Sequence, residues 1–322
     1  MEDRDRDRDC DRDLERNRDR GRNRDRDRLA ERFEAHRDRL RAVAFRMLGS
    51  SNDAEDAVQE AWVRLDRAGV DEVENLAGWL TTVVGRICLD MLRSRKARRE
   101  VAGDDDAVAA IPDDRLAEPE QETLLVESVG RALLVVLDRL TPAERVAFVL
   151  HDMFSVPFAE VGAIVDRTPA AAKKLASRAR QRIGGAADAS APDIDLAWHR
   201  RVVESFLAAA RGRDLAGLLA VLDPDVVRHA EAAGLPAGVP LQVSGAAAVV
   251  EETLLLTRNA MFADVVLIDG AVGLVVAPRG RLLLALAFVV KDGRIAEYSV
   301  IADPQRLARL ELAMPPQSSA GS

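Results

Sequence analysis

Basic side chains gather in one segment of this 322-residue chain, residues 168–183. Lysine and arginine neutralise the phosphates of nucleic acids, and no aspartate or glutamate interrupts them between Thr168 and Ile183. The residues that we predict to contact DNA from this segment are Thr168, Lys173, Lys174, Ser177, Arg178 and Arg180.

A helix-turn-helix would position these side chains. Pro157 starts a short helix, Asp166-Arg167 forms the turn, and Thr168 is an N-cap with Pro169 at the first helical position. A basic second helix held by a shorter first helix is the geometry that binds in the major groove. A solvated amphipathic helix in an ordinary bundle would show the same pattern. Its predicted buried stripe consists of Ala172, Leu175, Ala176, Ala179 and Ile183.

A second basic cluster ends the helix predicted over residues 76–100. The first half of this helix is apolar, and its end carries Arg93, Arg95, Lys96, Arg98 and Arg99. Cations near a helix C-terminus interact favourably with the helix dipole, which is one explanation of the cluster. Five cations within seven residues exceed that need, so we predict a phosphate contact.

An earlier helix, predicted over residues 54–68 with a cap at Ser51-Asn52-Asp53, has an acidic and polar outer surface. That surface suits a basic protein partner, although a merely solvated surface fits equally well. It consists of Asp53, Glu55, Asp56, Gln59 and Glu60. A helix with an apolar face, residues 29–48, precedes it.

A length of 322 residues favours two or three domains, and a hydrophobic content of 48% is enough for real cores. We find no signal peptide and no apolar run that could span a membrane, and the two cysteines, Cys10 and Cys88, form no metal or disulfide pattern. We therefore expect a cytoplasmic protein without a cofactor or metal. The net charge of −8 does not exclude nucleic acid, because the acidity is concentrated in residues 100–166.

The chain ends in a segment with an α+β pattern. Two helices, 198–210 and 215–222, precede a strand at 226–229, a glycine- and proline-rich loop and a helix after Ser244-Gly245. Asp223-Pro224 is expected to end the second helix, and Asp292-Gly293 is a type I′ hairpin signal. The closing strands of a twisted antiparallel sheet are predicted at 263–269, 271–277, 281–290 and 294–301.

Acid–base chemistry in this last segment would depend on His229, Glu231 and Asp264, with Tyr298 as a proton donor. No acid–base pair at a convincing spacing emerges, and the strands over 281–301 carry mostly aliphatic side chains. We therefore predict no catalytic residue.

Three stretches in this order resemble regions two and four of the extracytoplasmic-function sigma factors: DAEDAVQEAWVRL, WLTTVVGRICLDMLRSRKARRE and the segment from Leu140 to Ile183. The resemblance implies that Asp53, Asp56, Gln59 and Glu60 bind core RNA polymerase. It implies that the basic segment 168–183, with the DNA-contacting residues predicted above, reads the −35 element. It also implies that a loop at 70–75 holds a flipped base. The residues implied for the −10 element are Arg86, Asp90, Arg93, Arg95 and Lys96.

The final segment resembles the SnoaL-like, nuclear-transport-factor-2-like fold, a cone with an apolar pocket that some members of this sigma class carry as an internal regulator. The resemblance allows an intramolecular contact with the sigma regions and an unidentified small-molecule ligand. The glycine-rich loop typical of that subgroup is absent, and HAEAAGLPAG stands in its place.

The predicted fold is therefore multidomain, with two all-α domains followed by an α+β cone. The predicted divisions are a disordered Arg/Asp tail at 1–28, region two at 29–99, an acidic linker at 100–125, region four at 126–185, a linker at 186–195, the cone at 196–312 and a tail at 313–322. The predicted function is an alternative sigma factor for core RNA polymerase and promoter DNA, regulated by its own C-terminal domain. The alternatives are a helix-turn-helix repressor or activator with a ligand-sensing domain, and a SnoaL-like enzyme fused to a DNA-binding module.

Overall fold

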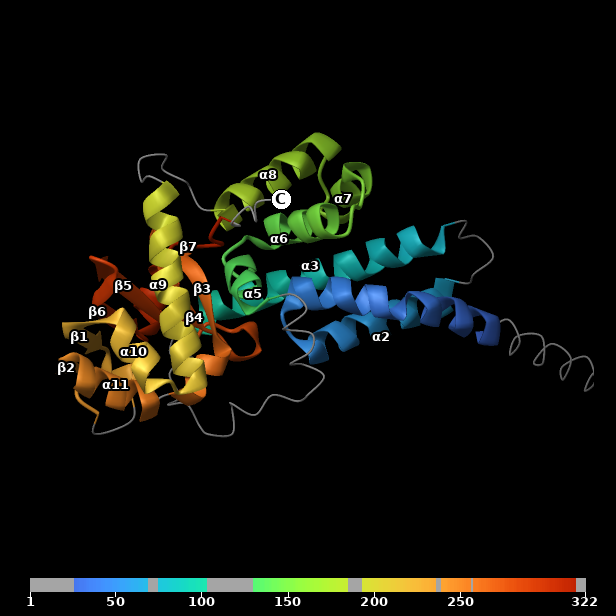
Figure 1. The fold of residues 1–322 in the computed structure, drawn as a ribbon. Coiled ribbons are helices and arrows are strands. Elements are labelled where there is room, and N and C mark those ends of the chain that lie inside the picture. The colour runs from blue at the N-terminus through green and yellow to red at the C-terminus, as the bar shows by residue number, and fades with distance from the viewer. Residues whose placement is uncertain are drawn as a thin grey trace, which may run out of the picture.

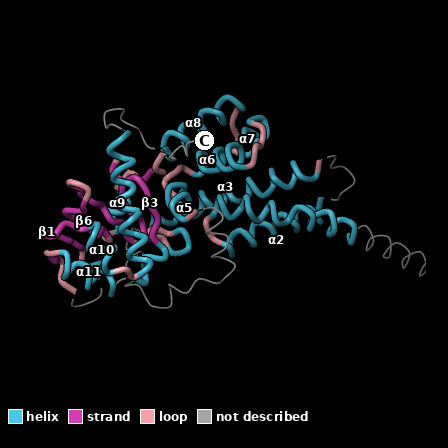
Figure 2. Tube along the Cα trace, viewed as in Figure 1, coloured by secondary structure: helices cyan, strands magenta, loops and turns pink. Residues whose placement is uncertain are grey.

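The computed structural model describes residues 26–68, 75–102, 130–184, 193–235, 239–255 and 257–316. Most of the predicted Arg/Asp tail, the loop at 70–74 and almost all of the acidic linker lie outside these residues. The described part is helical up to α9 and forms a sheet only in its last third (Figure 1). Figure 2 shows the strands confined to one end of the molecule.

The first helical domain has three long helices, which match the predicted ones closely. They are a helix over residues 26–48, α2 (Ser51–Ala68) and α3 (Leu76–Ala102). The cap predicted at Ser51-Asn52-Asp53 is wrong, because all three residues are already helical and the Ser50 hydroxyl accepts the Asp53 N–H at 3.3 Å. Asn75 caps α3 by accepting the Gly78 N–H at 3.0 Å.

The second helical domain is built from short helices. They are α5 (Arg131–Leu137), α6 (Pro142–Phe148), a π-helical turn at Val149–Met153, α7 (Phe158–Ile164) and α8 (Pro169–Gly184). A capping box starts α6, since Thr141 and Glu144 exchange side-chain and backbone hydrogen bonds. This domain lies on α3 (Figure 1).

The C-terminal domain is an α+β cone, as predicted. Its helices are α9 (Asp193–Gly212), α10 (Leu215–Val221), α11 (Ala246–Leu255) and α12 (Pro304–Arg309), with short 3₁₀ turns at Ala232–Gly234, Thr257–Phe262 and Pro278–Gly280. Its strands are β1 (Leu222–Ala230), β2 (Gln242–Ser244), β3 (Ala263–Ile268), β4 (Ala271–Val276), β5 (Leu284–Lys291), β6 (Arg294–Ile301) and β7 (Leu312–Ala313).

The sheet is mixed, so the antiparallel prediction is wrong at one pairing. The strand order is β2-β1-β6-β5-β4-β3-β7, and β1 pairs with β6 in parallel. β1 already begins at Leu222 and contains Pro224, where we expected a helix to end, because a register shift between Leu222 and Val227 lets the proline lie between paired residues. Asp292 and Gly293 both have positive φ, which confirms the predicted hairpin.

Other boundaries also differ from the expected ones, and the first helix already begins at residue 26, inside the predicted tail. α9 begins at Asp193, inside the predicted linker, and Ala313, expected to begin a tail, lies in β7. β5 begins at Leu284 instead of 281, because a 3₁₀ turn precedes it.

Alternate residues of β3, β4 and β5 face two different hydrophobic cores. Val266, Val275 and Ala285 belong to a core that continues through both helical domains. Leu267, Leu274 and Leu284 belong to a core inside the cone, which α9 covers. The same three strands therefore line the interior of one domain and form the surface on which the others pack.

Candidate DNA-binding surfaces and the docked C-terminal domain

The turn between α7 and α8 has the predicted helix-turn-helix geometry. The Thr168 hydroxyl accepts the Ala171 N–H at 3.2 Å, as expected of an N-cap. Asp166 has a φ of 55°. Gly162 is a determinant that the sequence patterns missed, because a Cβ there would lie 2.7 Å from the Arg167 carbonyl oxygen. The second helix can therefore cross the first closely only with glycine at this position.

The buried stripe of α8 agrees with the predicted one, apart from Leu175. Ala172, Ala176, Ala179 and Ile183 are buried, whereas Leu175 is half-buried at the edge of the core. The predicted DNA-contacting side chains are exposed, except for Ser177, which is half-buried.

Ion pairs divide the cations of α8 into two groups. Arg180 binds Asp152 at 2.6 Å, and Arg182 binds the buried carboxylate of Glu144 at 2.6 Å. Within the part of the chain that the structure describes, Lys173, Lys174 and Arg178 make no ion pair. These three carry the positive charge that α8 offers to a phosphate.

The basic helix α3 is joined to the helix-turn-helix. The Arg86 guanidinium donates to the Ala163 carbonyl at 3.0 Å, across 77 positions of sequence. A Cβ on Gly85 would lie 3.2 Å from Ile164 Cγ2 and 3.4 Å from Leu150 Cδ1. α3 therefore presents a glycine where α7 and the π-helical turn pack against it.

The other predicted residues of α3 differ in their surroundings. Arg95 donates to the Leu48 carbonyl at 2.8 Å and forms an ion pair with Asp53, so a predicted DNA contact and a predicted polymerase contact bind each other. Asp90 and Arg93 are exposed and lie 3.8 Å apart. Lys96 is exposed.

The outer surface of α2 keeps three of its four predicted polymerase contacts available. Asp56, Gln59 and Glu60 are exposed, and Glu60 binds Arg64 one turn later at 2.9 Å. Glu55, in contrast, binds Arg37. The exposed side chains form an acidic and polar patch.

Two family models match the two helical domains. Sigma-70 region 2 matches residues 32–98, and Sigma-70 region 4 matches residues 130–183. The extracytoplasmic-function (ECF) RNA polymerase sigma factor SigJ of Mycobacterium tuberculosis is 36% identical over 287 residues, which span 85% of this chain and 91% of SigJ.

The chain belongs to the ECF RNA polymerase sigma factors. SigI of Mycobacterium tuberculosis, a probable ECF sigma factor, is 39% identical over 204 residues, 62% of this chain and 69% of SigI. The crystal structure of SigJ aligns with 86% of this chain and 97% of its own, at 32% identity and a TM-score of 0.41. This sigma factor binds core RNA polymerase and promoter DNA and directs transcription initiation, which decides against the repressor alternative.

The C-terminal domain of the sigma factor is docked on region 4. Arg139 in region 4 donates to the carbonyls of Leu307 at 2.7 Å and Ala308 at 3.0 Å. At the other end of the interface, the Met314 N–H donates to the Ile183 carbonyl of α8 at 2.7 Å. The docking contact therefore includes the last helix of region 4.

Asp264 on β3 lies at the same interface. Burial raises the pKa of its carboxyl, while Arg131, Arg211 and the Ala132 N–H act in the opposite direction. Arg211 lies 3.5 Å from the carboxylate, and the Arg131 guanidinium is 5.7 Å from the centre of the Phe262 ring. Nearby, Gly280 has a φ of 68° and no room for a Cβ beside Leu134.

The side chains weighed for acid–base chemistry do not converge. His229 is half-buried and lies 3.5 Å from Glu297, and Asp264 lies at the docking interface. Glu231 accepts the Ala302 N–H at 2.7 Å and binds Arg306. Only Tyr298 of the four lines the large cavity of the cone, and burial raises its pKa to about 12.

Proposed function

We propose that the C-terminal domain restrains this sigma factor by holding region 4 against region 2. The observation that carries the proposal is the continuous hydrophobic core, which runs from the first helix through α3, α6 and α8 to the outer face of the sheet. In this arrangement the two DNA-reading domains and the regulatory domain form one packed body.

The restraint follows from the length of a promoter. The −10 and −35 elements lie roughly 25 base pairs apart, which is about 85 Å of duplex at 3.4 Å per base pair. α3 and α7 are in direct contact at Gly85 and Ile164, whereas α3 itself is only about 40 Å long at 1.5 Å per residue. Regions 2 and 4 must therefore separate before both elements can be bound.

The residue assignments within this function are also proposals. Lys173, Lys174 and Arg178 would supply the main phosphate contacts at the −35 element, because their charges are not paired inside the described part of the protein. Thr168, Ser177 and Arg180 would complete that surface, with Arg180 leaving Asp152 to do so.

At the −10 element, Arg86 would be released from Ala163 when the domains separate. Asp90, Arg93 and Lys96 are already exposed, while Arg95 would act mainly by holding α3 against the start of α2. The acidic patch of Asp56, Gln59 and Glu60 would bind core polymerase, with Asp53 supporting it through Arg95.

We further propose that the C-terminal domain performs no catalysis. The four candidates are dispersed, and a tyrosine with a raised pKa is a poor general acid–base group near neutral pH.

None of the helices in the described residues is long and apolar enough to cross a membrane. A cytoplasmic location is proposed because bacterial core polymerase acts there.

Run-off transcription with core polymerase tests the restraint. The full chain would be compared with a chain truncated after Gly185 and with Arg139→Ala, which removes the hydrogen bonds to Leu307 and Ala308. Both changes should raise transcript yield severalfold. Arg294→Ala, an exposed arginine in the β5–β6 hairpin, is the matched control. Lower yield from both the truncated chain and Arg139→Ala would mean that the domain activates.

A further inference from the structure

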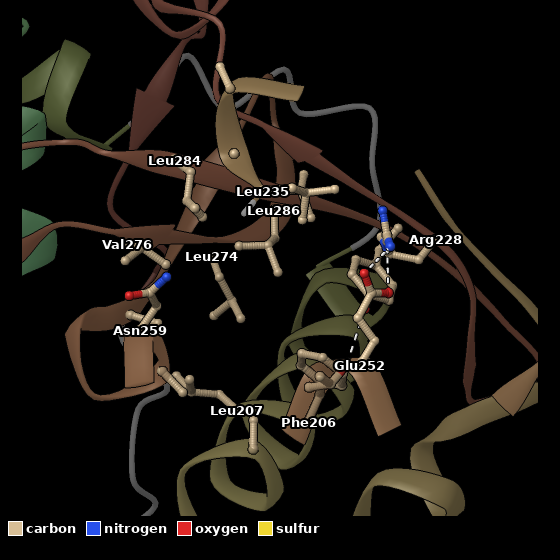
Figure 3. Close-up of a pocket in the computed structure, with 18 of the residues that line it drawn as sticks. Phe206, Leu207, Arg228, Leu235, Glu252, Asn259, Leu274, Val276, Leu284 and Leu286 are labelled. Carbon is tan, nitrogen blue, oxygen red and sulfur yellow. Dashed lines mark hydrogen bonds and ion pairs between the residues drawn. The ribbon is translucent and has the colours of Figure 1, made fainter. Parts of the chain in front are cut away.

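We propose that the cavity of the C-terminal domain binds a neutral, largely apolar small molecule that carries one hydrogen-bonding oxygen. The cavity has a volume of about 470 Å³, within the range of small-molecule sites. Aliphatic and aromatic side chains from α9 and the inner faces of β4 and β5 surround it (Figure 3). Among them are Phe206, Leu274 and Leu286.

The only charges in the described lining neutralise each other. Arg228 is almost completely buried and binds Glu252 through Nε at 3.0 Å. Its other nitrogens donate to the carbonyls of Pro240 at 2.9 Å and Leu241 at 3.2 Å. Figure 3 shows this pair at one side of the cavity. Because neither member is left without a counter-ion, an ionic ligand would be buried without compensation, and such burial is unfavourable.

Tyr298 adds no charge to the cavity near neutral pH. Burial raises its pKa to about 12, so its hydroxyl stays protonated, and it lies 3.3 Å from the Thr253 hydroxyl. The lining therefore selects a neutral ligand.

Asn259 supplies the hydrogen-bonding group. Its side chain lies beside Val276, away from the Arg228–Glu252 pair (Figure 3), and makes no hydrogen bond within the described residues. A ligand that accepts a hydrogen bond from this half-buried amide would be stabilised, because an unsatisfied polar group at an apolar surface is unfavourable. A carbonyl or hydroxyl oxygen on the ligand would accept from its NH₂ group.

The test uses the full chain and prodan, a fluorescent neutral naphthyl ketone, as the probe. Titration followed by fluorescence should show saturable binding at one site, with a blue-shifted emission. Anilinonaphthalene sulfonate, an anionic relative with a similar ring system, should bind at least about tenfold more weakly, in keeping with the uncompensated charge.

Leu286→Trp fills the cavity from β5 and should weaken prodan binding by about tenfold or more. Val289→Trp, on the same strand but exposed, should leave binding within about twofold. Asn259→Leu keeps the size of the side chain but removes the donor, and should weaken binding about fivefold. Circular dichroism checks folding, and if Leu286→Trp is unfolded, Asn259→Leu decides.

Three results would overturn the inference. They are the absence of saturable prodan binding, binding that none of the folded cavity variants changes, and sulfonate binding as tight as that of prodan. The outcome does not depend on the proposed restraint, since binding is measured without polymerase or DNA.

Discussion

At the scale of single residues, sequence position alone did not separate the cations that are available to DNA from those that hold the protein together. Lys174 and Arg178 have unpaired charges on α8 within the described residues, whereas Arg95, in an equally basic stretch, joins α3 to Leu48 and Asp53. The two groups should therefore respond differently to removal of the side chain.

Lys174→Ala and Arg178→Ala should each reduce transcription from a −35-dependent promoter severalfold without changing the melting temperature. Each loses a phosphate contact, so the salt dependence of promoter binding by the holoenzyme should fall by about one unit of log–log slope. Gln181→Ala, also exposed on α8, is the control. Wild-type transcription in both variants would disprove the assignment.

Arg95→Ala should instead lower the melting temperature by a few degrees. It removes the hydrogen bond to Leu48 and the pair with Asp53, together worth about 1–2 kcal/mol. Arg93→Ala removes only a long, exposed ion pair and should leave stability unchanged. Equal melting of the two variants, measured by differential scanning fluorimetry, would contradict the structural role of Arg95.

At the scale of elements, the contact between α3 and α7 depends on a residue without a side chain. Gly85→Leu would place a branched side chain against Ile164 and Leu150, which a Cβ alone already approaches to within 3.4 Å. We expect the two domains to separate, with a larger radius of gyration in small-angle scattering and higher transcript yield. Gly184→Ala, which meets nothing within 4 Å, should change neither quantity. An unchanged radius of gyration in a folded Gly85→Leu variant would mean that neighbouring side chains move aside while the two domains stay in contact.

The β3 interface should strengthen as the pH falls. The pKa of Asp264 is raised by burial, so the folded protein binds its proton more tightly than the unfolded chain does. Stability relative to Asp264→Asn should therefore increase as the pH is lowered through the raised pKa, down to the ordinary value of an aspartate. The melting temperatures of the wild type and of Asp264→Asn, recorded between neutral and acidic pH, test this prediction. Parallel curves of melting temperature against pH would contradict it.

At the scale of the whole molecule, local patterns predicted the elements, and long-range contacts remained hidden. The helix-turn-helix, the Asp292-Gly293 hairpin and the inner strands follow from caps, turn residues and periodicity, all of which act within a few positions. The parallel pairing of β1 with β6 and the bond from Arg86 to Ala163 join segments that are 70 to 77 positions apart. No local signal specifies such pairs.

The candidate site could be predicted to the same extent. The patterns located the basic and acidic surfaces, but they did not distinguish Arg95 and Arg180, which are engaged within the protein, from Lys174 and Arg178. The patterns also offered His229 and Asp264 for one acid–base site, although they lie on β1 and β3, which three strands separate in the sheet.

The short connection after α8 determines how strongly the docked domain competes with other partners for its docking surface. The chain leaves α8 at Gly184 and is helical again at Asp193, while Met314 returns to bond with Ile183. A domain on so short a tether meets its docking surface at an effective concentration in the millimolar range. A higher concentration of the protein would therefore not increase the fraction of molecules in which the domain has left its docking surface. Under the proposed restraint, core polymerase could do so by binding the separated regions.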